Sequence, residues 1–189
     1  MRSLWREEVC RIEPSRLVFV DEMGTHTSLA PLYAYAPIGE RAHLEIPRNR
    51  GKNTTLLTSL HRGGMGPSMA VEGATTSRVF ETYVERLLAP ALRPGQVVVM
   101  DNLGAHRPRR VRELIEERGC ELLYLPPYSP DLNPIEEALS KIKHLLRKIA
   151  ARTKEALIEA MGRALGAVDA QDVRGFFVHS GYSAPAQQL

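Results

Sequence analysis

The stretch that decides the fold spans residues 96–148. It begins with QVVVMDNLGAH (residues 96–106), a short apolar and β-branched run that ends abruptly on Asp101. Such a run is typical of a buried strand, which delivers the acid that follows it to the edge of a sheet. The stretch ends with ELLYLPPYSPDLNPIEEALSKIKHLLRK (residues 121–148), in which Glu136 opens a long amphipathic helix behind a proline-rich loop. Two carboxylates thus stand at the ends of two well-defined elements.

A third acid, Asp21, ends an earlier strand-like run, RLVFV (residues 16–20). Residues 21–24 are then expected to break this strand. Glu22 is the nearest rival to Asp21, but successive side chains of a strand point to opposite faces. We therefore expect Asp21, rather than Glu22, to lie with the other two acids.

Glu136 has two interpretations. With Asn133 as the N-cap and Pro134 at N1, Glu136 at N3 matches an Asn version of the capping box, in which its side chain bonds back to the backbone. The alternative is a ligand for a metal ion, and the two roles can coexist because a helix N-terminus favours an ionised carboxylate. Glu137 is the nearest rival, turned about 100° around the helix.

Composition indicates a single soluble domain. The chain has 189 residues, of which 43% are hydrophobic and 25% are charged, and its net charge of +3 leans only weakly towards anionic partners. Its two cysteines, Cys10 and Cys120, belong to no CxxC pair, so we expect reduced thiols rather than a disulfide framework. No signal-like segment and no apolar run near the roughly 18 residues of a membrane span is evident. These features predict an intracellular protein, located in the cytoplasm.

The order of the predicted elements indicates an α/β fold. Strands are predicted over residues 16–21, 53–60, 67–71, 97–100 and 122–125, and helices over 76–88, 109–118, 133–149 and 153–168. Close spacing of the first three strands favours an antiparallel meander, followed by two parallel strands in a mixed five-stranded sheet with helices on both faces.

The predicted division of the chain has three parts. Residues 1–15 form a lead-in, residues 16–150 the core, and residues 151–189 a C-terminal helical extension and tail of the same domain. Residues 29–47 contain several prolines and are predicted to be a loop, with a hairpin around residues 38–40.

The blocks VFVDE (residues 18–22), VVVMDNLGAH (97–106) and PPYSPDLNPIEEALSKIK (126–143) resemble the DDE transposases, specifically the bacterial insertion-sequence branch related to mariner elements. The resemblance extends from about Trp5 to Tyr182. It implies a ribonuclease H-like fold and metal-dependent DNA cleavage at transposon ends, followed by strand transfer into target DNA. It also implies that Asp21, Asp101 and Glu136 are the catalytic residues and the metal ligands. The resemblance further implies a bacterial protein that associates with the nucleoid when it is active.

The chemistry explains why acids are needed at these places. In-line displacement at phosphorus requires neutralisation of phosphate charge, an activated hydroxyl and a stabilised leaving oxygen, and two divalent cations about 3.5–4 Å apart supply all three. Mg²⁺ prefers oxygen ligands and keeps some of its waters, so a few carboxylates and the substrate phosphate suffice. The expected cofactor is therefore a pair of Mg²⁺ ions, for which Mn²⁺ can substitute.

Four further residues are candidates for supporting roles: Asn102, His106, Tyr128 and Asn133. His106 either positions water or phosphate beside Asp101 or simply forms a hydrogen bond within its loop. Tyr128 shapes the loop before Glu136 and is a candidate for DNA contact.

Two basic clusters flank the acids and are predicted to bind DNA. One follows Asp101 and comprises Arg107, Arg109 and Arg110; the other comprises Lys143 and Arg147, on the same helix face as Glu136. A run of charge is more often only a solvated surface, so these assignments depend on the nearby acids.

The expected partners are double-stranded DNA, at transposon ends and target, and a second copy of the chain in a homodimeric synaptic complex. The related transposases carry helix-turn-helix modules before the catalytic domain, and the stretch ahead of Arg16 is too short for one. Recognition of the ends is therefore expected to come from an upstream polypeptide or fusion, or to be lost. Two alternatives remain: a ribonuclease H-like nuclease without strand transfer, and an inactive, truncated DNA-binding remnant.

Overall fold

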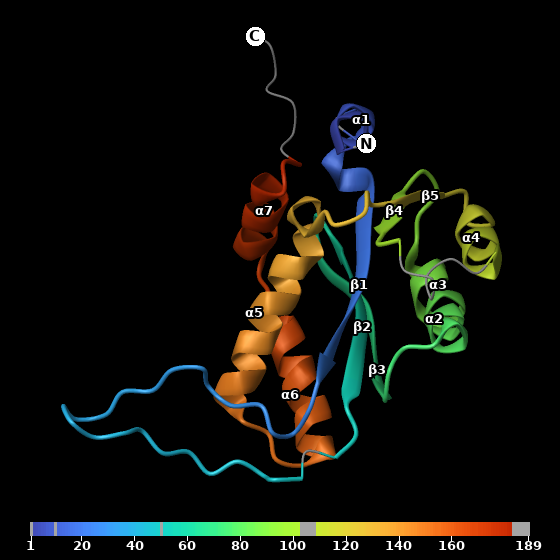
Figure 1. Cartoon of the computed structure of the whole chain (residues 1–189). Coiled ribbons are helices and arrows are strands. Elements are labelled where there is room, and N and C mark those ends of the chain that lie inside the picture. Colours follow the sequence, from blue (N-terminus) through green and yellow to red (C-terminus); the bar gives the residue numbers. More distant parts are fainter. Residues whose placement is uncertain (1, 10, 50, 103–108, 183–189) are drawn as a thin grey trace.

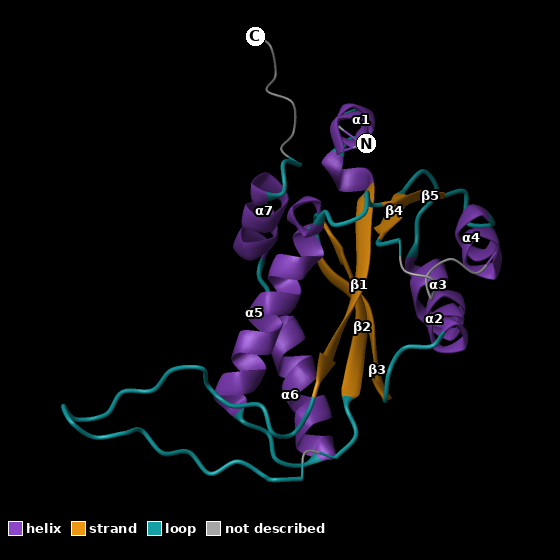
Figure 2. Ribbon diagram, in the orientation of Figure 1, coloured by secondary structure: helices purple, strands orange, loops and turns teal. Residues whose placement is uncertain are grey.

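A five-stranded mixed sheet forms the centre of the molecule (Figures 1 and 2). The computed structural model describes residues 2–9, 11–49, 51–102 and 109–182, without the side chains of residues 3 and 4. The strands, in chain order, are β1 (Leu17–Thr25), β2 (Thr54–His61), β3 (Gly64–Glu72), β4 (Val97–Met100) and β5 (Glu121–Tyr124). Their order across the sheet is β3-β2-β1-β4-β5, with β1, β2 and β3 antiparallel and with β4 parallel to both β1 and β5. The predicted topology is confirmed.

Helices cover both faces of this sheet (Figure 2). One face packs against α5 (Pro134–Ile149), α6 (Lys154–Gly166) and α7 (Ala170–His179). The other face packs against α4 (Arg109–Glu116) and a continuous helical segment made of α2 (Ser77–Tyr83), a π-helical turn (Val84–Leu88) and α3 (Ala89–Ala91). Helix α1 (Arg2–Val9) lies before β1 in the chain. Two short 3-10 turns are also present, at Pro14–Arg16 just before β1 and at Pro130–Leu132 just before α5.

Strand β1 is buried on both faces, which explains its continuous apolar run. Leu17 and Phe19 join the core beneath α5, whereas Val18 and Val20 join the core beneath α2 and α4. All four side chains are at most 3% exposed. Two-sided burial removes the apolar–polar alternation that a half-exposed strand shows.

The prediction that β1 ends at Asp21 is wrong. The strand continues to Thr25, because β2 pairs with it along the whole segment from Asp21↔Thr58 to Thr25↔Thr54. Asp21 therefore lies within β1 rather than at its tip. A run of mixed residues such as 21–25 forms a strand here because a neighbouring strand supplies its hydrogen bonds.

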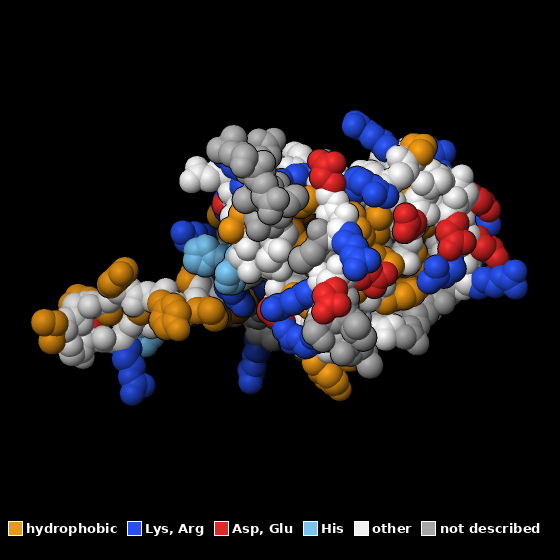
Figure 3. Space-filling view, turned by 90° about the horizontal axis from the view of Figure 1, so that it is seen from above, with side chains coloured by type: hydrophobic (Ala, Val, Ile, Leu, Met, Phe, Trp, Pro, Cys, Tyr) orange, Lys and Arg blue, Asp and Glu red, His pale blue; other side chains and the backbone are white. Residues whose placement is uncertain are grey.

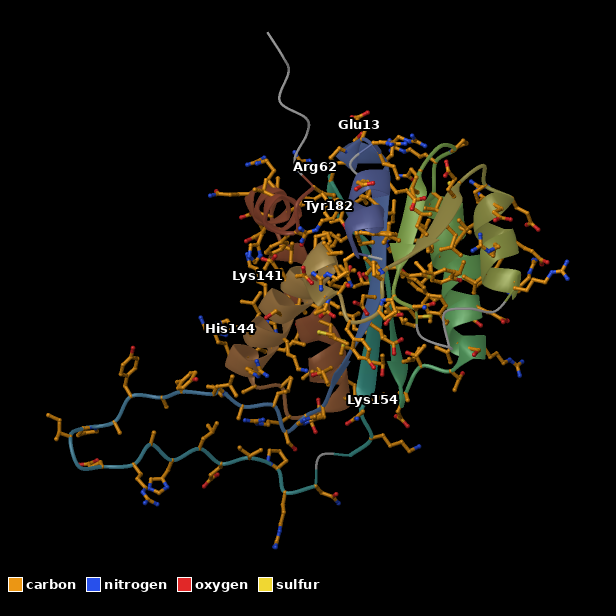
Figure 4. All side chains as sticks on the ribbon, turned by 45° about the horizontal axis from the view of Figure 1, so that its top comes forward. Glu13, Arg62, Lys141, His144, Lys154 and Tyr182 are labelled. Atoms are coloured by element: carbon orange, nitrogen blue, oxygen red, sulfur yellow. The ribbon has the colours of Figure 1, made fainter. Side chains whose placement is uncertain are left out.

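The predicted C-terminal tail contains a further helix, α7, which packs against the core. A capping box opens α7, since Asp169 accepts from the Asp172 backbone N–H while the Asp172 side chain accepts from that of Asp169. Phe177 and Tyr182 both reach the ring of Phe19 in β1, with ring centroids 5.6 Å and 5.0 Å away. Figure 4 shows Tyr182 directed towards β1 from the end of α7. The far C-terminal region thus contributes to the core that supports β1.

Between β1 and β2 a long segment leaves the body of the protein. We call residues 29–49 the arm; it extends well away from the sheet (Figure 1) and contains no helix or strand, although a turn closes where Glu40 N–H donates to Pro37 O (3.0 Å). At its base Arg152 Nη1 donates to the carbonyl oxygens of Thr27 (3.0 Å) and Leu29 (2.9 Å). Large hydrophobic side chains are exposed along the arm (Figure 3): Leu32, Tyr33, Tyr35, Ile38, Leu44 and Ile46.

Among the described residues, no helix has the length and apolar character required to cross a bilayer.

Candidate active site

The register between β1 and β4 brings two of the predicted acids together. These strands run parallel, and their last paired residues are Val20 and Met100. Asp21, within β1, and Asp101, directly after the end of β4, come immediately after that pair. Paired positions of neighbouring strands point to the same face, and the preceding matched pair, Phe19 and Val99, faces α5. Both acids therefore belong on the side of the sheet that α5 covers.

The third acid reaches the same place from α5. Glu136 stands in the first turn of this helix, directly after a proline-rich loop that leads back from β5. Asp21, Asp101 and Glu136 line a single pocket of about 410 Å³, whose other walls are Asn102, residues 125–130 and Asn133. Three acids that are distant in the sequence thus share one cavity.

Asp21 is held in a defined orientation. The residue is 7% exposed, and its Oδ1 accepts a hydrogen bond from the backbone N–H of Glu22 (2.7 Å). Its Oδ2 accepts from Nδ2 of Asn133 (2.8 Å). Hydrogen bonds that are donated to a carboxylate favour its ionised form, which is the form that binds cations.

The capping-box interpretation of Asn133 and Glu136 is wrong. Asn133 does occupy the N-cap position, but its side chain makes no capping hydrogen bond; only its backbone oxygen accepts from the N–H of Glu136 (3.0 Å). The Asn133 amide turns instead to Asp21. A buried carboxylate without a donor costs more free energy than a helix N–H that water can reach, so the buried group takes the amide.

The donor set of the pocket fits a hard divalent cation. Its described lining contains three carboxylates and no Lys, Arg or His. Oδ1 of Asn133 is also buried and has no hydrogen-bond partner, which leaves an amide oxygen beside Asp21. Mg²⁺ and Mn²⁺ bind such oxygen ligands. Within the described chain no three His, Cys, Asp or Glu side chains already form a closed metal-binding group. Mg²⁺ sites commonly use only one or two carboxylates, with water and phosphate as the remaining ligands.

A family model described as "DDE superfamily endonuclease" matches residues 16–158, which include all three acids. The chain belongs to this family. The predicted resemblance to DDE transposases is thereby confirmed at the level of the family, whereas its bacterial insertion-sequence branch stays a prediction.

Curated relatives of this DDE endonuclease are transposases of transposable elements. It is 30% identical over 108 residues to the Tcb1 transposase of Caenorhabditis briggsae and 31% identical over 108 residues to the Tc1 transposase of Caenorhabditis elegans. The first alignment covers 53% of this chain and the second 55%, and each covers 40% of the relative. The chain therefore spans less than half the length of these proteins.

Solved structures establish the fold. The chain resembles the Mos1 transposase paired-end complex with left transposon end with a TM-score of 0.76 at 20% identity, over 94% of this chain and 56% of that one. It resembles the catalytic domain of Mos1 mariner transposase with a TM-score of 0.66 at 17% identity, over 95% of this chain and 85% of that one. The predicted ribonuclease H-like fold is confirmed.

The acids that compete with the predicted set lie elsewhere. Glu137 faces α7, where its Oε1 lies 2.6 Å from Nδ1 of His179. Glu22 does not line the pocket. Asp131 pairs with Arg2 and lines a different pocket. The geometry therefore places Glu136, and not Glu137, in the pocket with the other two acids.

The supporting candidates divide into two groups. Asn102, Tyr128 and Asn133 line the pocket with the acids. His106 lies outside the described residues, as does Arg107 among the predicted DNA contacts. The roles predicted for these two residues stay predictions.

The predicted DNA-binding residues differ in their surroundings. On α4, Arg109 pairs with Glu113 (2.8 Å), and Arg110 pairs with Glu117 (3.4 Å) and Glu113 (3.7 Å). These pairs balance the positive charge of α4 within the helix itself.

On α5, Lys143 and Arg147 are half-exposed on the face that also carries Glu136, and neither has an ion pair within the described chain. In contrast, Lys141 pairs with Asp172 of α7, and His144 projects from the side of α5 that faces away from the sheet (Figure 4). The positive charges of Lys143 and Arg147, on the same face of α5 as Glu136, are therefore available to a ligand.

Proposed function

We propose that this DDE endonuclease is the catalytic part of a transposase, which cleaves DNA at transposon ends and joins the ends to target DNA. The observation that carries the proposal is the convergence of Asp21, Asp101 and Glu136, from two strands and a helix, on one pocket with an oxygen-only set of charged ligands. Membership of the DDE endonuclease family and similarity to the Tc1 and Tcb1 transposases support it.

Each acid has a definable part in this activity. Asp21 and Asp101, on adjacent strands, would hold one divalent cation between them, and Glu136 would complete the site of a second. Such a pair of ions neutralises phosphate charge, activates the attacking hydroxyl and stabilises the leaving oxygen. Asn133 keeps Asp21 oriented, while the exposed side chain of Glu136 can adjust to the ion and the substrate. Solved Mos1 complexes with Mg and with Mn support Mg²⁺ as the cofactor and Mn²⁺ as its substitute.

The substrate in this proposal is double-stranded DNA, and Lys143 and Arg147 mark its path along α5. At 1.5 Å per residue, the stripe from Glu136 to Arg147 is about 16 Å long. That length brings several consecutive phosphates of one strand within reach of the two cations. The related Mos1 structures include a paired-end complex with a transposon end and a strand transfer complex, which supports DNA as the substrate class.

Homodimerisation in a synaptic complex is the further part of the proposal. The arm exposes six large hydrophobic side chains, and monomeric soluble proteins seldom leave such patches uncovered. A second copy of the chain is the partner we propose for it. Recognition of the transposon ends by an upstream helix-turn-helix polypeptide or fusion remains part of the proposal as well.

A cleavage and joining assay tests this function against its alternatives. Precleaved transposon-end DNA and a target plasmid are incubated with Mg²⁺ or Mn²⁺ and with the chain, its fusion to the upstream coding region, or the Asp101→Ala variant. A transposase gives joined product that disappears in Asp101→Ala. Cleavage without joining favours a nuclease, and no Asp101-dependent product with either metal favours an inactive remnant.

A further inference from the structure

Tyr128 is an exposed aromatic residue in a strained backbone conformation. Its side chain is 97% exposed and its φ is +53°, in the left-handed region that bulky residues rarely adopt. Outside the arm, no other Phe, Tyr or Trp of the described chain is exposed. Residues in this conformation cluster at functional sites, where the surrounding structure holds them.

The neighbours of Tyr128 impose this conformation. Prolines at positions 126, 127 and 130 stiffen the loop on both sides. Ser129 is buried and its Oγ donates to the carbonyl oxygen of Pro127 (3.2 Å), while Nη1 of Arg2 donates to the carbonyl oxygen of Tyr128 (3.4 Å). The backbone is thus fixed, and the ring is left without packing contacts of its own.

The position of the ring suggests its ligand. Tyr128 lines the same pocket as Asp21, Asp101 and Glu136, so it stands beside the place where the proposed function puts the scissile phosphate. The nucleotides joined by that phosphate carry bases with flat π-faces. Aromatic side chains stack on any such base, because stacking does not depend on the pattern of hydrogen-bonding groups.

We propose that Tyr128 is a stacking platform for a nucleobase that is unpaired next to the scissile phosphate. This inference rests on the proposed function, because it needs DNA in the pocket. Stacking on Tyr128 would replace the contact that the base loses with its neighbour in the duplex, and so would hold the strand open where the acids act.

Two properties of Tyr128 are separable by substitution. Tyr128→Phe keeps the ring and removes the hydroxyl group, for which the described chain offers no hydrogen-bond partner. Tyr128→Gly removes the ring and also relieves the backbone, since Gly adopts φ near +53° freely. Tyr128→Leu removes the ring and keeps the strain. Ala150, with φ of +52° at the end of α5, offers a matched control, because Ala150→Gly relieves the same strain away from the pocket.

The experiment measures binding of a short duplex with a three-nucleotide single-stranded overhang that carries 2-aminopurine. Fluorescence anisotropy gives the affinity, and quenching of 2-aminopurine reports stacking on the ring. Ca²⁺ replaces Mg²⁺, and a gel checks that the strand stays intact. A fully paired duplex of the same length serves as a second probe, and thermal unfolding of each variant reports stability.

The proposal predicts that Tyr128→Gly and Tyr128→Leu bind the overhang DNA about 5- to 150-fold more weakly and lose the quenching, whereas Tyr128→Phe keeps both. Tyr128→Gly should nevertheless melt at or above the temperature of the wild type, as should Ala150→Gly, which should bind normally. Binding and quenching by Tyr128→Gly and Tyr128→Leu at wild-type levels would overturn the proposal.

A loss in Tyr128→Phe as large as in Tyr128→Gly would also overturn it, because the hydroxyl group would then be the contact. If the wild-type protein bound neither probe, the proposed function itself would fail and this inference with it.

Discussion

Asn133 and Asp21 are joined by a buried hydrogen bond of 2.8 Å from the amide Nδ2 to the carboxylate Oδ2. The two residues are far apart in the chain, one in β1 and the other at the start of α5. Asn133 is 3% exposed and Asp21 is 7% exposed, so water cannot readily replace either partner. This contact fixes the entry of the helix that carries Glu136 against the strand that carries Asp21.

Substitution of Asn133 tests whether this residue stabilises the protein through its contact with Asp21 or through capping of α5. Ser equals Asn as an N-cap, but its side chain is too short to reach Asp21. We therefore expect Asn133→Ser to destabilise the protein about as much as Asn133→Leu, by about 1.5–3 kcal/mol at pH 7, the range for hydrogen bonds to charged groups. Urea denaturation without divalent cations measures the difference. If Asn133→Ser were as stable as the wild type, helix capping would be the contribution of Asn133 instead.

The two basic clusters should differ in their contribution to DNA binding. We expect the double variant Lys143→Gln and Arg147→Gln to reduce the slope of log affinity against log salt concentration by roughly 1.8, since each lost phosphate contact accounts for about 0.9. The control is Arg109→Gln with Arg110→Gln, whose side chains are already paired with Glu113 and Glu117. Fluorescence anisotropy measures the salt slope of each double variant at KCl concentrations from about 50 to about 200 mM, a range over which such slopes can be separated. A larger change in the control would reverse the assignment.

An exposed ion-pair network should contribute to acid sensitivity. Lys154 (2.5 Å) and Lys52 (3.0 Å) flank Glu72 at the end of β3, and their hydrogen bonds and charges lower the pKa of Glu72 from 4.5 to about 2. Lys154 marks the site of this network in Figure 4. A carboxyl with a depressed pKa stabilises the fold above its unfolded value and loses that contribution as the pH falls through its folded value.

Glu72→Gln should therefore lower the melting temperature near pH 7, and the difference from wild type should shrink between about pH 4.5 and pH 2. Because the network is exposed, 1 M NaCl should also reduce the difference. A difference that grew towards low pH, or that ignored salt, would contradict this explanation.

Helix α7 should unfold together with the core rather than separately. Phe177 is fully buried, and Tyr182 donates from its hydroxyl group to the carbonyl oxygen of Leu132 (2.6 Å), just before Asn133. We expect Phe177→Ala to cost about 3–5 kcal/mol and Tyr182→Phe about 1 kcal/mol. Chemical denaturation measures both, and Val178→Ala, at an exposed position of the same helix, is the matched control. A separate early transition for α7, with the core unaffected, would show that the predicted C-terminal extension is independent.

Local sequence pattern predicted most of the framework and the three acids. The apolar run before Asp101 and the proline-rich loop before Glu136 are short-range signals. The first indicates where a strand ends, and the second where a helix begins. Which acids meet then follows from the parallel register of β1 and β4.

The failures share a physical cause, which is contact between distant segments. The continuation of β1 to Thr25 depends on pairing with β2, and the orientation of the Asn133 amide depends on the buried carboxylate of Asp21. Neither partner is close in sequence. The start of α7 differs, because Asp169 and Asp172 form a capping box whose residues are close together in the sequence and do not depend on a distant partner.

We propose that Asp21, Asp101 and Glu136 bind divalent cations together. Titration with Mn²⁺, followed by the electron paramagnetic resonance signal of the free ion, tests it on the folded chain without DNA. Asp21→Asn, Asp101→Asn and Glu136→Gln should each weaken binding by at least about tenfold, while Glu137→Gln, which removes the carboxylate facing α7, should bind as the wild type does. Undiminished binding in all three variants, or a loss in Glu137→Gln with Glu136→Gln unaffected, would show that these three acids do not form the metal site.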